Sequence, residues 1–168
     1  MNKKSAQRII PLRDKRGQTL VEFALILPLL FLMLFGLIEL SVMFYVNLTM
    51  QNAVRQGART SVVGSSSGGP TQRTALIQAI KDSSNGLYDK DAHGAPQLTT
   101  YIVTPGNSTF TNFTGANIGG AGQIVMVRLD YTWPLLTQIL SPFFANDEYS
   151  FTVKATMRNE RFLSSGGG

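Results

Sequence analysis

The 168-residue sequence contains no cysteine, a single histidine and a single tryptophan. Without cysteine the chain forms no disulfide, no thiolate metal site and no thiol nucleophile. His93 stands alone in a polar stretch without clustered carboxylates, so we interpret it as a solvated loop residue rather than a metal ligand or a member of a catalytic triad. The sequence therefore indicates no catalytic residues, no metal and no cofactor, and an enzyme is the weakest of the functional classes that we consider.

Charge is scarce in one part of the chain and concentrated in another. Residues 1–17 contain six basic residues and one acidic residue, which account for the whole formal net charge of +5, whereas residues 23–38 carry no charge. A nucleic-acid-binding protein carries a basic patch on its folded domain, and the remainder of this chain is formally neutral, so we predict no nucleic-acid partner. A basic segment before an apolar run instead orients a membrane helix, with the amino terminus in the cytoplasm and the rest outside.

The apolar run is long enough to span a membrane only with its flanks. The 16 uncharged residues 23–38 rise about 24 Å at about 1.5 Å per residue, against a hydrocarbon core of about 30 Å. Residues 20–46 are long enough, provided that Glu22 and Glu39 are tolerated. The pattern predicts one transmembrane helix.

Beyond the span, we expect the helix to continue to about Val63 as an amphipathic helix. Arg55 and Arg59 lie one helical turn apart on a separate face, which we interpret as solvated. The apolar residues recur at three- and four-residue steps and form the opposite stripe: Met43, Val46, Met50, Ala53 or Val54, Gly57 or Ala58, and Val62.

Three residues within the span need their own interpretation. Glu39 either faces a neighbouring subunit or lies at the outer headgroup boundary as the helix leaves the bilayer, and we favour the boundary. Pro28 and Gly36 are candidate kink positions, although both residue types are common in membrane helices in any case.

The remaining residues predict a small α+β domain. A short helix is expected at about residues 71–83, with Thr71 at its start and Asn85-Gly86 after its end. Alternating apolar and polar residues predict an antiparallel sheet of about three strands with one packed face. The strand candidates are residues 98–103, 123–133 and 149–158, separated by a loop at 104–122 and by an apolar segment at 135–144 that covers the sheet or contacts a neighbour.

The expected organisation has five parts. They are a basic leader at residues 1–17, read as disordered and removable, a transmembrane and amphipathic helix at 18–63, a Gly/Ser linker at 64–70, an extracytoplasmic α+β domain at 71–163 and a flexible tail at 164–168.

The junction between leader and helix is the most informative motif. A secretory signal is cut after its apolar run, but here Gly17 and a basic segment precede the run, and Glu22 follows five residues after the glycine. A carboxylate inside a membrane costs about 2.5–3.5 kcal/mol on insertion scales, which suggests a partner. A cut after Gly17 would place a free α-amino group on Gln18, about one helical turn from Glu22. The other interpretation of Glu22 is a position near the headgroups, where the cost is small.

Three stretches of the chain resemble the TadE-like family of tight-adherence pilus systems, which are related to type IV pili. The first is GQTLVEFA at residues 17–24, followed by LPLL at 27–30 and Gly36; the second is QNAVRQGAR at 51–59, and the third is ATMRNE at 155–160. The resemblance covers most of the chain, is strongest over residues 17–63 and is loosest over residues 64–122.

The resemblance implies a minor pilin or pseudopilin that contributes to pilus assembly, surface adhesion and biofilm formation. Gly17 and Gln18 would flank the cut made by a prepilin peptidase, and Glu22 would be the assembly glutamate. The implied partners are that peptidase, other pilin subunits and the assembly machinery of the bacterial inner membrane. The implied location is that membrane, crossed once, with incorporation into a cell-surface pilus left open.

One departure bears on the type of subunit. Major pilins of these systems are very short, whereas this chain carries a domain of roughly 100 residues, which favours a minor, tip or initiating component. TadF- and TadG-like forms share the signature. The alternative function is that of an uncleaved, single-pass membrane-anchored protein whose extracytoplasmic domain binds a ligand.

Overall fold

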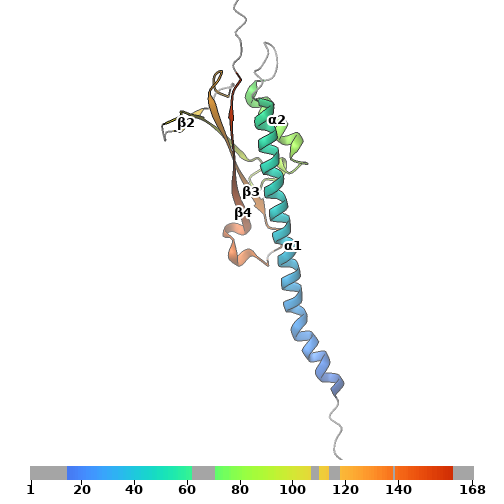
Figure 1. Cartoon of the computed structure of the whole chain (residues 1–168). Helices are drawn as coiled ribbons and strands as arrows, with labels where there is room; N and C mark the ends of the chain where they lie inside the picture. Colours follow the sequence, from blue (N-terminus) through green and yellow to red (C-terminus); the bar gives the residue numbers. More distant parts are fainter. Residues whose placement is uncertain (1–14, 62–70, 107–109, 114–117, 138, 161–168) are drawn as a thin grey trace, which may run out of the picture.

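The computed structural model describes residues 15–61, 71–106, 110–113, 118–137 and 139–160. They form one long helix, one short helix and a four-stranded antiparallel sheet (Figure 1). The predicted α+β class is therefore confirmed. The predicted linker at 64–70 and the tail at 164–168 lie outside the described residues, as do residues 1–14 of the predicted leader.

The long helix, α1, spans Lys15–Ser61 and contains 47 residues. At about 1.5 Å per residue it is about 70 Å long. It begins before the predicted start at residue 18, so the last three residues of the predicted leader are helical rather than disordered. The predicted stop at about Val63 lies just beyond the described part of the helix.

The two halves of α1 have different surroundings. The domain packs beside the C-terminal half, whereas the N-terminal half projects away from it (Figure 1). An 18-residue window of this helix has a mean hydropathy of 2.6, and none of the window is buried. By length and composition α1 fits a single-pass membrane anchor, as predicted.

The second helix, α2, spans Gln72–Ser83 and has local start and stop signals. The hydroxyl oxygen of Thr71 accepts a hydrogen bond from the backbone N–H of Thr74 at 3.3 Å, which makes Thr71 the N-cap. After the helix ends, Asn85 and Gly86 both have positive φ angles, of 52° and 79°. The predicted helix boundaries are confirmed.

The sheet has the strand order β2-β1-β3-β4, with every neighbouring pair antiparallel. The strands are β1 at Gln97–Val103, β2 at Phe110–Phe113, β3 at Ile124–Pro134 and β4 at Glu148–Arg158. Buried residues alternate along β3 as predicted, with Val125, Val127, Leu129 and Tyr131 at 1% exposure or less.

The sequence predicted about three strands, and the fourth is β2. It lies within the stretch predicted as loop, and pairs with β1 at the edge of the sheet. β2 has only four residues, too few for a period-2 pattern to stand out from its polar flanks.

The core lies between the helices and one face of the sheet. α1 contributes the predicted stripe, in which Val46, Met50, Ala53 and Val54 are fully buried. α2 contributes Leu76 and Ile80 to the same cluster. Arg55 and Arg59 are exposed, as the amphipathic pattern predicted.

Candidate functional site

The predicted cleavage junction lies in the first turns of α1. The side-chain amide of Gln18 donates a hydrogen bond to the Glu22 carboxylate at 3.0 Å, and both side chains are exposed. Both residues lie in α1, so the backbone nitrogen of Gln18 is about one helical turn from Glu22. Among the described residues, a Cβ atom added to Gly17 would meet nothing within 4 Å, so their packing does not require glycine there.

Pro28 and Gly36 both lie inside α1, which continues through them as one helix (Figure 1). Pro28 has no N–H to bond the carbonyl four residues earlier, so the helix lacks one internal hydrogen bond there. A Cβ at Gly36 would also meet nothing within 4 Å. A kink at either residue stays a prediction.

Glu39 has hydrogen-bond partners within its own chain, which the sequence did not predict, and its position relative to a membrane stays a prediction. Its side chain is 1% exposed and is buried against the domain of its own chain. The carboxylate accepts hydrogen bonds from the backbone N–H of Leu136 at 2.7 Å and of Thr137 at 3.0 Å, and from the Thr137 hydroxyl at 2.9 Å. We call this contact the Glu39 clasp.

The clasp fixes the position of the domain along α1. Hydrogen bonds to a charged group contribute about 1.5–3 kcal/mol each to stability, and losing the acceptor would leave the donors unsatisfied. Farther along α1, the Asn47 side-chain amide donates to the Tyr149 hydroxyl of β4 at 3.2 Å. The C-terminal half of α1 is therefore attached to the domain by polar contacts as well as by the core.

Gly57, the glycine of the QNAVRQGAR stretch, lies where α1 packs against α2. A Cβ at this position would lie 2.5 Å from the Cγ1 atom of Ile80 and 3.1 Å from the carbonyl oxygen of Leu76. Both residues belong to α2. Glycine therefore allows the two helices to approach closely, and its role in this stretch is packing.

Asn159 gives the ATMRNE stretch a structural role. The residue is 2% exposed, and its side-chain amide donates to the backbone carbonyls of Ile118 and Gly120. Its own backbone N–H donates to the carbonyl of Gln123 at 2.9 Å. Asn159 thus closes the end of the sheet against the segment that precedes β3.

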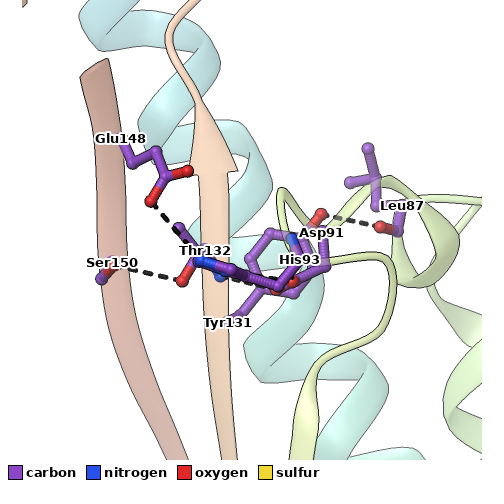
Figure 2. Close-up of polar contacts among 7 residues, drawn as sticks. All are labelled: Leu87, Asp91, His93, Tyr131, Thr132, Glu148 and Ser150. Carbon is purple, nitrogen blue, oxygen red and sulfur yellow. Dashed lines mark hydrogen bonds and ion pairs between the residues drawn. The ribbon is translucent and has the colours of Figure 1, made fainter. Parts of the chain in front are cut away.

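A polar cluster ties the loop after α2 to the sheet (Figure 2). The Asp91 carboxylate accepts from the backbone N–H of Thr132 at 2.7 Å and of His93 at 2.9 Å. The Tyr131 hydroxyl donates to the carbonyl of Leu87 at 2.7 Å. Burial raises the pKa of the Tyr131 phenol well above its usual value, and the nearby Asp91 carboxylate adds to the rise.

His93 lies at the surface of this cluster. Its side chain is 66% exposed, and its ring nitrogens are each 3.9 Å from a carboxylate oxygen, of Asp91 on one side and Glu148 on the other. Within the described part of the chain, no group of three or more His, Cys, Asp or Glu residues is arranged to hold a metal ion. The contacts of the cluster are those of a structural network that joins a loop to β3 and β4.

Comparison with known proteins gives a family match on the N-terminal helix α1. The family model described as TadE-like protein matches residues 17–59. No curated protein and no solved structure gave a significant match. The matched segment begins at Gly17, runs along α1 to within two residues of its end and includes none of the sheet. The resemblance inferred from the sequence is therefore confirmed over residues 17–59 of α1, where the chain is similar to TadE-like proteins.

Proposed function

We propose that this chain is a minor pilin or pseudopilin of a tight-adherence pilus system. In this proposal a prepilin peptidase cuts the chain after Gly17, and the mature subunit contributes to pilus assembly, surface adhesion and biofilm formation. Its role is structural, with no catalytic step of its own. Its partners are the peptidase, other pilin subunits and the assembly machinery of the inner membrane.

The observation that carries the proposal is the uncovered apolar half of α1, which begins where the family match begins. Large apolar side chains are exposed along this half, with Leu20 71%, Leu25 73% and Met33 66% accessible. So much contiguous apolar surface is unstable in water and must be covered by lipid or by other apolar helices. A pilin subunit uses both environments, first in the membrane and then in the fibre.

Two glycines on the uncovered half support contacts outside this chain. Neither Gly17 nor Gly36 is required by packing within the part of the chain that the structure describes, because an added Cβ would meet nothing there at either position. Small residues allow close approach between helices in membranes, so Gly36 suits contact with a neighbouring subunit. Gly17 suits recognition by the peptidase.

Glu22 is proposed as the assembly glutamate. It is exposed on an apolar helix and has a neutral amide, from Gln18, as its hydrogen-bond donor. A cut after Gly17 would create an amino group one turn away, and the carboxylate would then pair with its own or a neighbouring amino terminus. Pairing offsets the cost of placing a carboxylate among apolar helices.

The proposed location follows from charge and size. The excess of basic residues before the span favours a cytoplasmic amino terminus and an extracytoplasmic domain. The second helix and the four-stranded sheet form a substantial domain, which favours a minor component over a shaft subunit.

Replacement of Glu22 tests the proposed role. We expect Glu22→Ala to insert in the membrane and to be cleaved normally, but to fall about tenfold in sheared pili, the equivalent of about 1.4 kcal/mol of lost pairing. Glu22→Asp keeps the charge and should restore part of the assembly. Immunoblots of membrane and pilus fractions measure both effects, and wild-type amounts of Glu22→Ala in pili would contradict the role.

A further inference from the structure

The connection between β3 and β4 is a folded loop rather than a simple turn. It comprises residues 135–147, of which the structure describes 135–137 and 139–147, and contains two short 3₁₀ turns, at Ser141–Phe143 and Ala145–Asp147. The backbone N–H of Leu135 donates to the carbonyl of Asp147 at 2.9 Å, so the two ends of the loop meet. We call this segment the β3–β4 loop.

The Glu39 clasp holds the β3–β4 loop at a defined position along α1. Two of its backbone N–H groups, those of Leu136 and Thr137, bind the Glu39 carboxylate. Figure 1 shows the loop as the part of the domain nearest the N-terminal half of α1. The loop is therefore the first part of the domain that a membrane around this half would meet.

The depth of the loop follows from helix length, and this step rests on the proposed placement of α1 in a bilayer. From Gln18 to Glu39 the helix rises about 31 Å at about 1.5 Å per residue, which matches a hydrocarbon core of about 30 Å. Glu39 then lies at the boundary between hydrocarbon and headgroups. Because the loop is bonded to Glu39, it lies at the same boundary.

The composition of the loop suits that boundary. Its sequence, LLTQILSPFFAND, contains no basic residue and one acidic residue, Asp147, whose carboxylate accepts a hydrogen bond from the Ser141 hydroxyl. Phe143 is 80% exposed and Leu136 is 59% exposed. Apolar side chains so exposed in water are unfavourable, whereas contact with acyl chains would bury them.

The adjoining face of α1 has the same character. Phe44 is 67% exposed and Tyr45 is 55% exposed, within two turns of Glu39. Aromatic residues are enriched where membrane proteins cross the lipid–water interface. The two segments that the Glu39 clasp joins, α1 and the β3–β4 loop, therefore both carry exposed aromatic side chains.

We propose that the β3–β4 loop is a second membrane contact, which places Leu136 and Phe143 among the lipids of the leaflet that faces the domain. The partner is a phospholipid surface, in continuity with the membrane span of α1. Insertion is shallow, because irregular backbone is not stable in the hydrocarbon core and the 3₁₀ turns need polar partners. The span and the loop together fix how the domain is oriented on the membrane, since one attachment alone would leave it free to rotate.

The absence of cysteine makes this proposal directly measurable. A single cysteine introduced into the full chain gives one attachment point for a nitroxide label. Phe143→Cys and Leu136→Cys test the loop, and both side chains are exposed enough to be replaced with little loss of packing. Phe110→Cys, at a 54% exposed phenylalanine on edge strand β2, is the water control, and Leu29→Cys, at a 60% exposed residue of α1, is the lipid control.

The labelled proteins are reconstituted in vesicles of phosphatidylcholine and phosphatidylglycerol. Power saturation then compares collisions of the label with oxygen, which concentrates in lipid, and with a water-soluble nickel chelate. We expect the oxygen-to-nickel ratio at Phe143 and Leu136 to be severalfold higher than at Phe110 and lower than at Leu29.

The other outcomes separate this proposal from the proposed function. A lipid-like signal at Leu29 with equal ratios at Phe143 and Phe110 would overturn the loop contact alone. A water-like signal at Leu29 would overturn the membrane span and the loop contact together. Protection of Phe143 from both reagents, with dipolar broadening between labels, would identify a second copy of the chain as the partner and contradict a lipid partner.

Discussion

At the scale of single residues, the two glutamates of α1 have different surroundings. Glu39 is buried and accepts three hydrogen bonds from the β3–β4 loop, whereas Glu22 is exposed and accepts one from a neighbouring amide. A buried carboxylate is stable only with such donors, so Glu39 is fully engaged within its own chain. Glu22 is the one of the two whose carboxylate lies open to a partner outside the chain.

Replacing Glu39 should destabilise the domain. In Glu39→Ala the N–H groups of Leu136 and Thr137 lose their acceptor, and we expect the free energy of unfolding to fall by about 2–4 kcal/mol. Thermal unfolding in detergent micelles, followed by Trp133 fluorescence, measures the change. Glu22→Ala is the matched control and should shift stability by less than about 0.5 kcal/mol. Equal unfolding of the two variants would contradict the importance of the clasp.

Because of Tyr131, we expect the free energy of unfolding to fall at alkaline pH. Its pKa is raised in the folded chain by burial, so the folded state holds the phenolic proton more tightly than the unfolded state. The stabilisation is complete below the unfolded pKa of about 10 and is lost as pH rises through the folded pKa. Urea unfolding between pH 8 and pH 11 should therefore show a stability that stays level at first and falls as pH passes about 10. Tyr131→Phe should make the fall shallower, and an equally steep fall in this variant would contradict the account.

At the scale of elements, the crossing of α1 and α2 depends on one glycine. A methyl group at Gly57 would overlap Ile80 and press on the backbone of Leu76. Overpacking of this kind costs about 1–3 kcal/mol, because neither a Cγ1 atom nor a backbone carbonyl moves easily. The close contact joins the helix that matches the TadE-like family model to the domain that follows it.

Gly57→Ala should therefore lower the midpoint of urea unfolding. Gly36→Ala places the same methyl group in the same helix where nothing lies within 4 Å, so it should leave the midpoint unchanged or raise it slightly. Comparing the two variants separates the contact with α2 from the general effect of alanine in a helix. A lower midpoint for Gly36→Ala but not for Gly57→Ala would contradict the proposed role of Gly57 in the contact between α1 and α2.

Local patterns predicted most of these elements, and distant contacts explain what they missed. Residues close together in the sequence determine three of these features, which could therefore be predicted: the apolar stripe of α1, the ends of α2 and the alternation along β3. β2 is a strand because it pairs with β1, and its four residues are too few to show a strand pattern in the sequence. The partner of Glu39 is a pair of backbone N–H groups 97 and 98 residues away, and no side-chain pattern encodes such a contact.

At the scale of the whole molecule, the proposed cut would change the chain in two ways. Removing residues 1–17 would take away the entire formal net charge of +5 and leave a neutral mature protein. The same cut would create an amino group on Gln18, which in the proposed function would pair with Glu22 and offset its cost among apolar helices. Cleavage and the role of Glu22 therefore form a single hypothesis, whose alternative is an uncleaved anchored protein.

The intact mass of the protein extracted from membranes tests this hypothesis most directly. Because a side chain at Gly17 would meet nothing, Gly17→Val should leave the domain folded and serves as a variant in which only the cut is blocked. In cells that express the pilus system, we expect a wild-type amino terminus at Gln18 and a Gly17→Val protein that keeps residues 1–17. A wild-type protein that retains Met1 and the full basic leader would contradict the account.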